Sequence, residues 1–386
     1  MKNRKIINNG AVFDGVNLYD QGAVLFENGK ILEIYKKDKS FADIPVIDAR
    51  GNLIMPGIVD LHSDSLERSI EKRKNVFFDI GFAILNIDRH LACCGITSFC
   101  HAISFADNEL GLRSPNQAEK CVEKIEEFNK TCQSLVKHNI HIRYEIGSKQ
   151  SLKILMRLID KGLVDILSIM DHTPGQGQFK SMESYVKFHA DEYAISEQEI
   201  LKKAEKKLKK NEHAWHMVNK LTKAVSNAEI PLLSHDDDTK GKINLIKKLG
   251  VGASEFPVTM EAAMAASNIG IDVFMGAPNL IRNQSTNGNL KASKVIEQDL
   301  CTGLVSDYYP ESLIQACFMA SEFTKDIGTA LGKVTSGPGN FLNQPGIPGQ
   351  LVQGSDADII IVNRQNSWAH VSHTIVRGNT VFQCRS

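Results

Sequence analysis

Residues Met55–Arg68, MPGIVDLHSDSLER, carry the first and clearest indication of the fold. A Pro-Gly pair precedes a short apolar run, and the run ends in His62-Ser63-Asp64. Side chains at positions i and i+2 of a strand lie on the same face, so His62 and Asp64 point the same way. One such pair is a weak sign of a metal site, but it becomes informative when other strands end in the same manner.

Seven further apolar segments alternate with longer amphipathic stretches, which is typical of repeated βα units around a parallel sheet. Eight βα units in about 250 residues have the size of a TIM-type barrel. The sequence therefore predicts an α/β fold, a (β/α)8 barrel over residues 56–344. Its strands should end near Asp64, Ile103, Glu145, His172, His235, Glu255, Gly276 and Asp307.

The two ends of the chain have a different pattern. Residues 5–55 read as short alternating strands, with a hairpin dipeptide at Asn28-Gly29, and the C-terminal segment repeats this style with a turn at Gly378-Asn379. We expect residues 1–55 and 345–386 to form one small β-sandwich domain beside the barrel. The long connection 174–230 should hold extra helices, in the position of a lid over the site.

Composition excludes several classes of protein. The 386 residues carry 45 basic and 45 acidic side chains, so a zero net charge offers no footprint for nucleic acid or anionic membranes. The basic stretch at 202–210 is expected to be a solvated helix face. No apolar run reaches the length of a membrane span, and the eight cysteines include no CxxC pair. These features predict a cytoplasmic enzyme, and its size suggests a homodimer.

Most of the predicted strands end in His, Asp or Glu, and in a barrel all strand ends meet on one face, where active sites lie. Imidazole and carboxylate groups are ligands for zinc and similar ions, and a two-metal site needs five or six of them. Structural alternatives stay open, namely an Arg143–Glu145 ion pair, loop-capping histidines and a helix cap at Asp307. The predicted metal ligands are His62, Asp64, Glu145, His172, His235 and Asp307.

A polar segment follows the seventh strand, GAPNLIRNQSTNGNLKAS, and leads into a helix predicted from Leu290. Barrel enzymes often hold phosphate on loops after strands seven and eight. A guanidinium can contact two phosphate oxygens at once. A plain surface turn is the alternative. The predicted phosphate-binding residues are Arg143, Arg282, Ser285, Asn287 and Asn289.

The motif MPGIVDLHSDSLER and the two-part β-domain resemble the amidohydrolase superfamily. The further motifs GITSFCHAIS, RYEI, MDHTPGQGQF, HDDDT, EFPVT, GAPN and SDYYPESLIQA resemble, in order, the PhnM-type amidohydrolases of phosphonate metabolism. Such an enzyme acts in the carbon–phosphorus lyase pathway and releases pyrophosphate from α-D-ribose 1-methylphosphonate 5-triphosphate.

The resemblance also implies roles at the site. Two divalent ions are expected, with zinc favoured over manganese, nickel or iron. Glu145 would bridge them, and Asp307 would accept a proton from the attacking water. Two segments depart from the family pattern, at 72–75 and 282–289, and both lie in expected substrate loops. The metal chemistry is therefore predicted more firmly than the substrate.

Two other functions fit the same residues. A hydrolase of this fold that cleaves a C–N bond, such as a deacetylase or cyclic amidase, would use the same metal site. A non-catalytic ligand-binding barrel is disfavoured, because all six predicted positions retain side chains able to bind a metal.

Overall fold

The structure is a computed structural model. It describes residues 4–107, 111–131, 133–172, 177, 182–193, 196–285, 288–365 and 368–384.

An eight-stranded parallel sheet forms the barrel, in the order β15-β14-β13-β12-β11-β10-β9-β6. Its first and last strands meet at a parallel bridge between Ser63 and Asp307, where the Asp307 amide donates to the His62 carbonyl at 3.0 Å. All eight predicted strands are confirmed, as is the barrel. The strands are β6 Ile58–Ser63, β9 Ile96–Phe105, β10 Lys137–Glu145, β11 Ile166–Met170, β12 Leu232–His235, β13 Ala253–Glu255, β14 Asp272–Gly276 and β15 Gly303–Val305.

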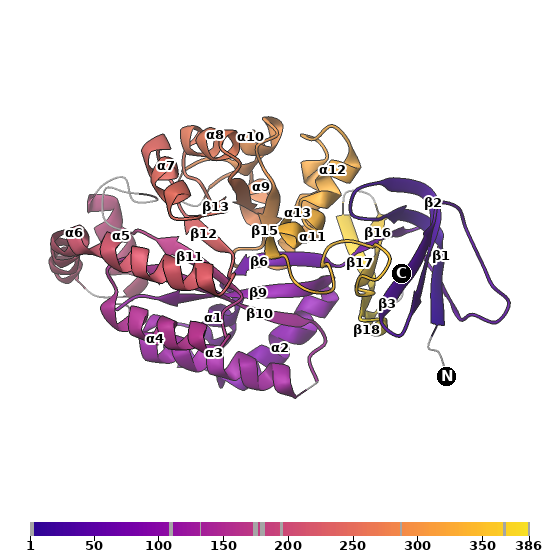
Figure 1. Cartoon of the computed structure of the whole chain (residues 1–386), viewed down its shortest axis with the longest axis horizontal. Coiled ribbons are helices and arrows are strands. Elements are labelled where there is room, and N and C mark those ends of the chain that lie inside the picture. Colours follow the sequence, from indigo (N-terminus) through magenta and orange to yellow (C-terminus); the bar gives the residue numbers. More distant parts are fainter. Residues whose placement is uncertain are drawn as a thin grey trace.

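Helices cover the outside of this sheet, with α2, α3 and α4 on one side and α7, α8 and α10 on the other (Figure 1). A short hairpin, β7 Glu71–Arg73 and β8 Val76–Phe77, follows α1. The helices are α1 Ser65–Ile70, α2 Ile80–Cys93, α3 Pro115–Lys130, α4 Lys149–Asp160, α5 Met182–Tyr193, α6 Glu197–Asn227, α7 Lys240–Lys248, α8 Met260–Asn268, α9 Ala277–Arg282, α10 Ala292–Glu297, α11 Ser312–Ala320, α12 Ile327–Gly332 and α13 Ser336–Leu342, with a 3-10 turn η1 Gly111–Arg113.

Side-chain periodicity explains these elements. Every residue of β11, ILSIM, is buried, as expected for a strand covered on both faces. Helix α4 buries Leu152, Leu155 and Leu158 at helical spacing. Thr239 and Thr259 begin α7 and α8, and each hydroxyl accepts a hydrogen bond from the amide three residues on. The large core therefore lies between strands and helices, and a smaller apolar cluster fills the barrel below the site.

The two ends of the chain join in one mixed sheet of eight strands, ordered β18-β17-β16-β5-β1-β2-β3 with β4 against β1. The turn predicted at Asn28-Gly29 is confirmed, because both residues have the positive φ that tight hairpins need. The second turn lies one residue earlier than predicted, at Arg377-Gly378, and Asn379 begins β18. The boundaries 55/56 and 344/345 remain predictions. The strands are β1 Arg4–Phe13, β2 Leu18–Glu27, β3 Lys30–Tyr35, β4 Val46–Asp48, β5 Leu53–Pro56, β16 Ile359–Gln365, β17 Trp368–Val376 and β18 Asn379–Gln383.

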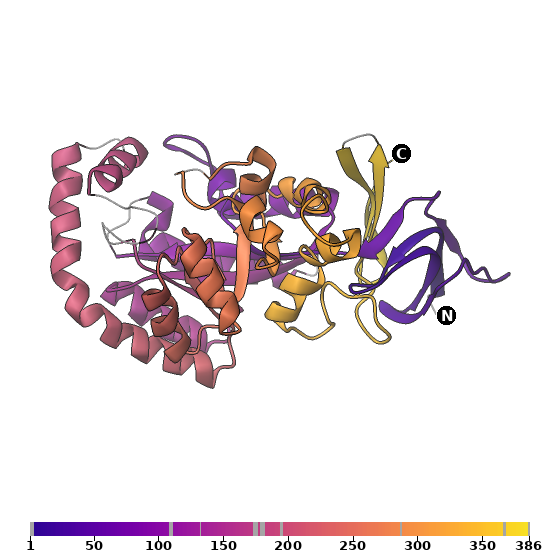
Figure 2. The same ribbon diagram turned by 90° about the horizontal axis from the view of Figure 1, so that it is seen from above.

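The long connection between β11 and β12 holds two extra helices, as predicted. Helix α6 is 31 residues long and lies at the end of the molecule away from the mixed sheet (Figure 2). The basic stretch 202–210 lies within α6, while most of its side chains fall outside the described part. Among the described helices, none is both long and apolar enough to cross a membrane. A lid function for these helices stays a prediction.

A side chain at Gly57, directly before β6, is expected to damage the barrel. A Cβ there would lie 2.1 Å from the Thr97 hydroxyl of the neighbouring β9, and Thr97 is buried. Gly57→Ala should therefore lower the free energy of unfolding by about 1–3 kcal/mol. Gly241→Ala is the matched control, since Gly241 is exposed and a Cβ there would lie 3.9 Å from the Thr239 hydroxyl, an ordinary contact distance. A lower thermal midpoint is expected for Gly57→Ala alone. Equal midpoints for both variants would contradict this reading.

Candidate metal centre

A bulge in β6 turns His62 towards the barrel interior. Val59 and Leu61 belong to the apolar cluster inside the barrel, so strict alternation would direct His62 outward. The register with β9 shifts between Asp60 and Ser63, which inserts one extra residue and changes the parity. As a result, His62 follows Leu61 on the inner side, next to residues from β10 and β13.

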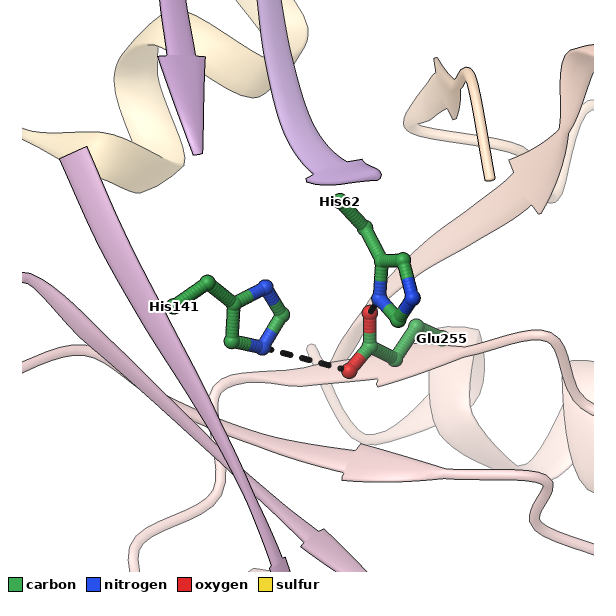
Figure 3. A group of neighbouring side chains, drawn as sticks. All are labelled: His62, His141 and Glu255. Atoms are coloured by element: carbon green, nitrogen blue, oxygen red, sulfur yellow. Dashed lines mark hydrogen bonds and ion pairs between the residues drawn. The ribbon is translucent and has the colours of Figure 1, made fainter. Parts of the chain in front are cut away.

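His62, His141 and Glu255 form the most deeply buried polar group of the site (Figure 3). His62 Nδ1 lies 2.6 Å from one oxygen of Glu255, and His141 Nε2 lies 3.6 Å from the other. Burial lowers the pKa of His62, but Glu255 more than offsets this and raises it. Burial likewise raises the pKa of Glu255, yet His62 and His141 hold it well below its usual value. The three side chains therefore concentrate a carboxylate and two imidazoles at one point.

The hydrogen bonds of His141 define which of its nitrogens is free to act as a ligand. Nδ1 lies 2.7 Å from the Leu61 carbonyl, which only accepts, so Nδ1 carries the proton. Nε2 then presents its lone pair towards Ser168 and Glu255. Burial lowers the pKa of His141 to about 4, so the ring stays neutral at physiological pH. A neutral imidazole held by a backbone carbonyl is the usual form of a metal-ligating histidine.

A second group comes from the ends of β11 and β12. His172 Nε2 lies 3.6 Å from Asp236 Oδ2, and His235 Nδ1 lies 3.1 Å from the same oxygen. Glu145, at the end of β10, contacts His172 Nδ1 at 3.0 Å. Burial raises the pKa of Asp236, but the two histidines hold it well below its usual value. Ligand atoms of three residues thus converge here as well.

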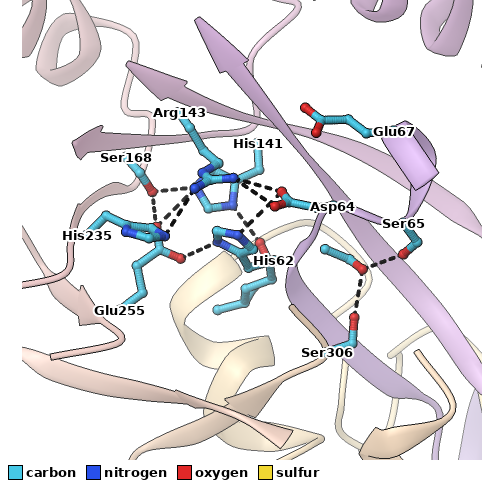
Figure 4. Close-up of polar contacts among 12 residues, drawn as sticks. His62, Asp64, Ser65, Glu67, His141, Arg143, Ser168, His235, Glu255 and Ser306 are labelled. Atoms are coloured by element: carbon cyan, nitrogen blue, oxygen red, sulfur yellow. Dashed lines mark hydrogen bonds and ion pairs between the residues drawn. The ribbon is translucent and has the colours of Figure 1, made fainter. Parts of the chain in front are cut away.

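A third group contains Asp64, Asp307 and again His62, whose Nε2 is 3.8 Å from Asp64 Oδ1. Arg143 connects the groups: its Nη1 donates to both oxygens of Asp64 at 2.8 and 3.0 Å, and Nη2 lies 3.4 Å from His235 Nε2 (Figure 4). Burial raises the pKa of Asp64, but Arg143, followed by His62, lowers it to about 2. Asp64 is therefore ionised and rigidly oriented.

Asp307 has the opposite electrostatics. Burial, and then the negative charge of Asp64, raise its pKa to about 7, although His62 and Arg143 act against them. A carboxyl group with a pKa near neutrality can both accept and donate a proton. Asp64 and Asp307 thus lie close together but have different pKa values, because the charges around them differ.

Three residues at the mouth adopt left-handed backbone conformations directly after their strands. The φ angles are 56° at Asp236, 54° at Phe256 and 59° at Asp307. Such conformations are costly for residues other than glycine and are concentrated at functional sites. The Phe256 ring lies edge-on to His62, with centroids 5.0 Å apart, and to His235 at 5.2 Å. Its ring therefore shields these two imidazoles on one side.

Each of the six residues predicted as metal ligands lies in or against one of these groups. His62, Asp64 and Asp307 are together, His172 and His235 are together, and Glu145 contacts His172. Their roles as ligands remain predictions. The structure adds three residues with suitable ligand atoms, which are His141, Glu255 and Asp236.

Sequence signals for the added residues were present. His141 precedes Arg143 and Glu145 at i−2 and i−4 on the same strand face, and Glu255 ends a predicted strand as His235 does. Asp236 adjoins His235, but alternation would place neighbouring side chains on opposite faces. The left-handed backbone at Asp236 removes that restriction.

The predicted phosphate-binding residues have more varied surroundings. Arg143 is buried and bound to Asp64, rather than to Glu145 or open to solvent. Arg282 is exposed at the end of α9, while Ser285 and Asn289 are half-buried in the segment that follows. Asn287 lies outside the described residues. The binding of phosphate by these residues stays a prediction.

His101, which ends near the mouth in sequence, belongs to a separate structural cluster. Its Nε2 lies 2.8 Å from His138 Nδ1, and His138 Nε2 lies 3.0 Å from Asp88 on α2. Both rings stack between the outer face of the sheet and the helices. Neither histidine belongs to any of the three groups described above.

We expect His101 to make the fold sensitive to acid. Burial, and then His138, hold its pKa well below the usual 6.5. Because the unfolded chain takes up this proton first, stability is retained above pH 6.5 and falls below it, by about 1.4 kcal/mol per pH unit. Between pH 7 and 5, the free energy of unfolding of His101→Gln should fall less steeply with decreasing pH than that of the wild type, by the amount just given. The exposed His216→Gln should keep the wild-type slope, and equal slopes in all three proteins would disprove the effect.

The donor set fits divalent metal ions. His235 Nδ1 and Asp236 Oδ2 are buried and make no hydrogen bond among the described residues, so their lone pairs are available. A cation would also offset the negative charge of the carboxylates that converge here. Nitrogen and oxygen donors of this kind accept zinc and the neighbouring divalent ions.

Comparison with known proteins shows which family this chain resembles. No family model matches the sequence. Alpha-D-ribose 1-methylphosphonate 5-triphosphate diphosphatase of Escherichia coli (strain K12) is 30% identical over 366 residues, covering 94% of this chain and 96% of that protein. A solved amidohydrolase superposes with a TM-score of 0.63 at 14% identity, covering 99% and 100% of the two chains. Dihydropyrimidinase from Brevibacillus agri gives 0.61 at 13% identity, covering 98% and 95%.

The barrel, the mixed sheet built from both chain ends and the buried His/His/Glu group define a metal-dependent hydrolase of the amidohydrolase superfamily. Within that superfamily, the likeness over nearly the whole chain shows that this protein belongs to the PhnM-type diphosphatases.

Proposed function

We propose that this protein releases pyrophosphate from α-D-ribose 1-methylphosphonate 5-triphosphate, leaving the 5-phosphate, in phosphonate metabolism. The observation that carries the proposal is the 30% identity to the Escherichia coli diphosphatase along 94% of the chain. The converging histidines and carboxylates support it chemically, because a polyphosphate needs both charge neutralisation and an activated water.

We further propose that the site holds two divalent ions, with zinc expected first. The residues that would hold them are His62, Asp64, Glu145, His172, His235 and Asp307, together with His141, Asp236 and Glu255. Bound there, the ions would lower the pKa of a water molecule and neutralise charge on the phosphoryl group. Metal analysis of the purified protein tests this, and a preparation that binds no divalent ion would contradict it.

The protein's own residues have distinct parts in this scheme. Asp307 accepts the proton of the attacking water, as its raised pKa favours. Arg143 keeps Asp64 ionised and fixed through its two hydrogen bonds. Arg282, Ser285, Asn287 and Asn289 contact phosphate oxygens from the segment after β14.

The first experiment is pyrophosphate release by the metal-quantified protein, with ribose 1-methylphosphonate 5-triphosphate, ATP and simple amides assayed in parallel. Preferential release from the ribosyl phosphonate supports the proposal. Turnover of an amide instead would favour the C–N hydrolase, since the same metal chemistry can act on a carbonyl.

We also propose that the protein is a cytoplasmic homodimer. None of the described cysteines forms a disulfide, which suits a reducing compartment. Cyclic dimers are the commonest assemblies of enzymes. Light scattering and cell fractionation test these two points separately.

A further inference from the structure

A cavity of about 550 Å³ opens beside the barrel mouth, outside the three groups of metal-binding side chains. Its lining comes from α1, the hairpin that follows it, the start of α2 and the segment after β15. This volume lies in the range of small-molecule sites.

The cavity adjoins the chain segments that carry Asp64 and Asp307. Ser65 on its wall directly follows Asp64, and Tyr308 directly follows Asp307. Hydrogen bonds hold these segments together: Ser306 donates to Ser63 at 2.8 Å, and the Ser63 and Ser65 hydroxyls are 2.5 Å apart (Figure 4). The cavity therefore borders the two segments that carry Asp64 and Asp307 into the metal-binding groups.

The cavity offers positive charge that is not taken up by neighbouring carboxylates. Arg143 is bound to Asp64, and Arg113 is bound to Glu67 at 2.9 Å. Arg68 and Lys72 are exposed, and within the described part of the chain neither forms an ion pair with a carboxylate. The side chains of Arg68 and Lys72 are therefore available to bind an anionic ligand.

The acidic group of the cavity is already partnered. Glu311 is the one carboxylate among the lining residues of this cavity, and its Oε1 lies 2.9 Å from His90 Nε2. Two cations therefore outweigh one paired carboxylate, and the cavity has a net positive charge.

Aromatic rings form the other walls. The ring centroids of Phe78 and Phe82 lie 6.0 Å apart, and Tyr308 and Tyr309 also line the cavity. The Arg68 guanidinium lies 4.9 Å over the Tyr308 ring, which orients its planar donors. The cavity thus combines oriented cations with apolar surface, as an anion that bears a small alkyl group requires.

We propose that this cavity binds the phosphonate end of the substrate, with Arg68 and Lys72 on its oxygens and the aromatic walls around its methyl group. The inference rests on the proposed function, which requires a substrate that is anionic at both ends. Cleavage of the triphosphate takes place at the metal-binding groups, so the opposite end needs a second cationic site. A guanidinium meets the two free oxygens of a phosphonate ester in a bidentate manner.

The test compares ribose 1-methylphosphonate 5-triphosphate with ribose 5-triphosphate, which lacks the phosphonate. Arg68→Gln and Lys72→Gln should each raise KM for the full substrate by about tenfold, since a hydrogen bond to a charged group is lost. Neither should alter KM or kcat for ribose 5-triphosphate. Arg364→Gln is the matched control, because Arg364 also stacks on an aromatic ring, Phe318, but from β16 of the mixed sheet.

Two results would overturn the inference. An equal loss on both substrates would mean that the cations serve the triphosphate or the fold, and no change on either would mean that the cavity is not used. If the wild type cleaves neither substrate, the proposed function fails, and calorimetry with ribose 1-methylphosphonate 5-phosphate then decides the cavity separately. Binding that Arg68→Gln weakens would support the cavity, and absent binding would reject it.

Discussion

Replacing Asp307 with asparagine should lower kcat by about 10²- to 10⁴-fold, the range contributed by a positioned acid or base. The amide form cannot accept a proton, and it removes the carboxyl group whose pKa lies near 7. The fold should be unchanged, because Asp307 joins the first and last strands through its backbone rather than its side chain. Steady-state pyrophosphate release, with circular dichroism and metal content measured on the same sample, checks the prediction.

The choice of asparagine matters because Asp307 has a φ of 59°. Asparagine adopts this left-handed conformation readily, whereas alanine would add backbone strain. Asp299→Asn is the matched control, since Asp299 has a φ of 56° but lies at the surface near Lys325. Full turnover and normal metal content in Asp307→Asn would show that Asp307 is not the proton acceptor.

The second large effect is expected at Glu255, which was predicted as a strand end but not as a metal ligand. Glu255→Gln should weaken metal binding by about 10- to 100-fold, whether Glu255 binds the metal or orients His62. The variant leaves His62 without its carboxylate partner at 2.6 Å and lowers the negative charge of the site. Isothermal titration with zinc and the activity at limiting zinc measure the effect.

Thermal unfolding gives an independent readout for the same variant. A ligand that binds only the folded state raises the melting temperature, so a chelator should lower that of the wild type more than that of Glu255→Gln. Glu261→Gln is the control, because Glu261 accepts a backbone hydrogen bond from Lys240 at the surface. An equal change in melting temperature on adding the chelator to all three proteins would show that Glu255 has no part in metal binding.

Much of the fold follows from local sequence patterns. Strands such as β11 are continuous apolar runs, helices such as α4 have apolar residues at helical spacing, and the hairpin turns carry residues that tolerate positive φ. These preferences act over a few residues, so they can be recognised without knowledge of the rest of the chain. The order of strands then follows because parallel βα units are linked right-handedly to their neighbours.

The candidate site was predicted where strand ends carry polar residues, but its contacts were not. Arg143 was expected to pair with Glu145 two residues away or with phosphate, and it binds Asp64 at the end of β6 instead. These two residues are 79 positions apart in sequence and meet because β6 and β10 both flank β9 in the sheet. Glu255 contacts His62 because the sheet closes between β15 and β6.

Local sequence patterns therefore predicted the barrel, a β-domain built from both chain ends and the edge on which the polar residues gather. The arrangement of that β-domain as one mixed sheet, rather than a sandwich, became clear only from the structure. Tertiary structure alone decided which of those residues meet, and it did so through a bulge at His62 and left-handed residues at Asp236 and Asp307. Alternation of side chains is a local rule, whereas a bulge depends on the register with β9. The pKa values of Asp64 and Asp307 also depend on residues that are distant in sequence. Both groups are buried in the folded barrel, and the charges that act on them come from separate strands.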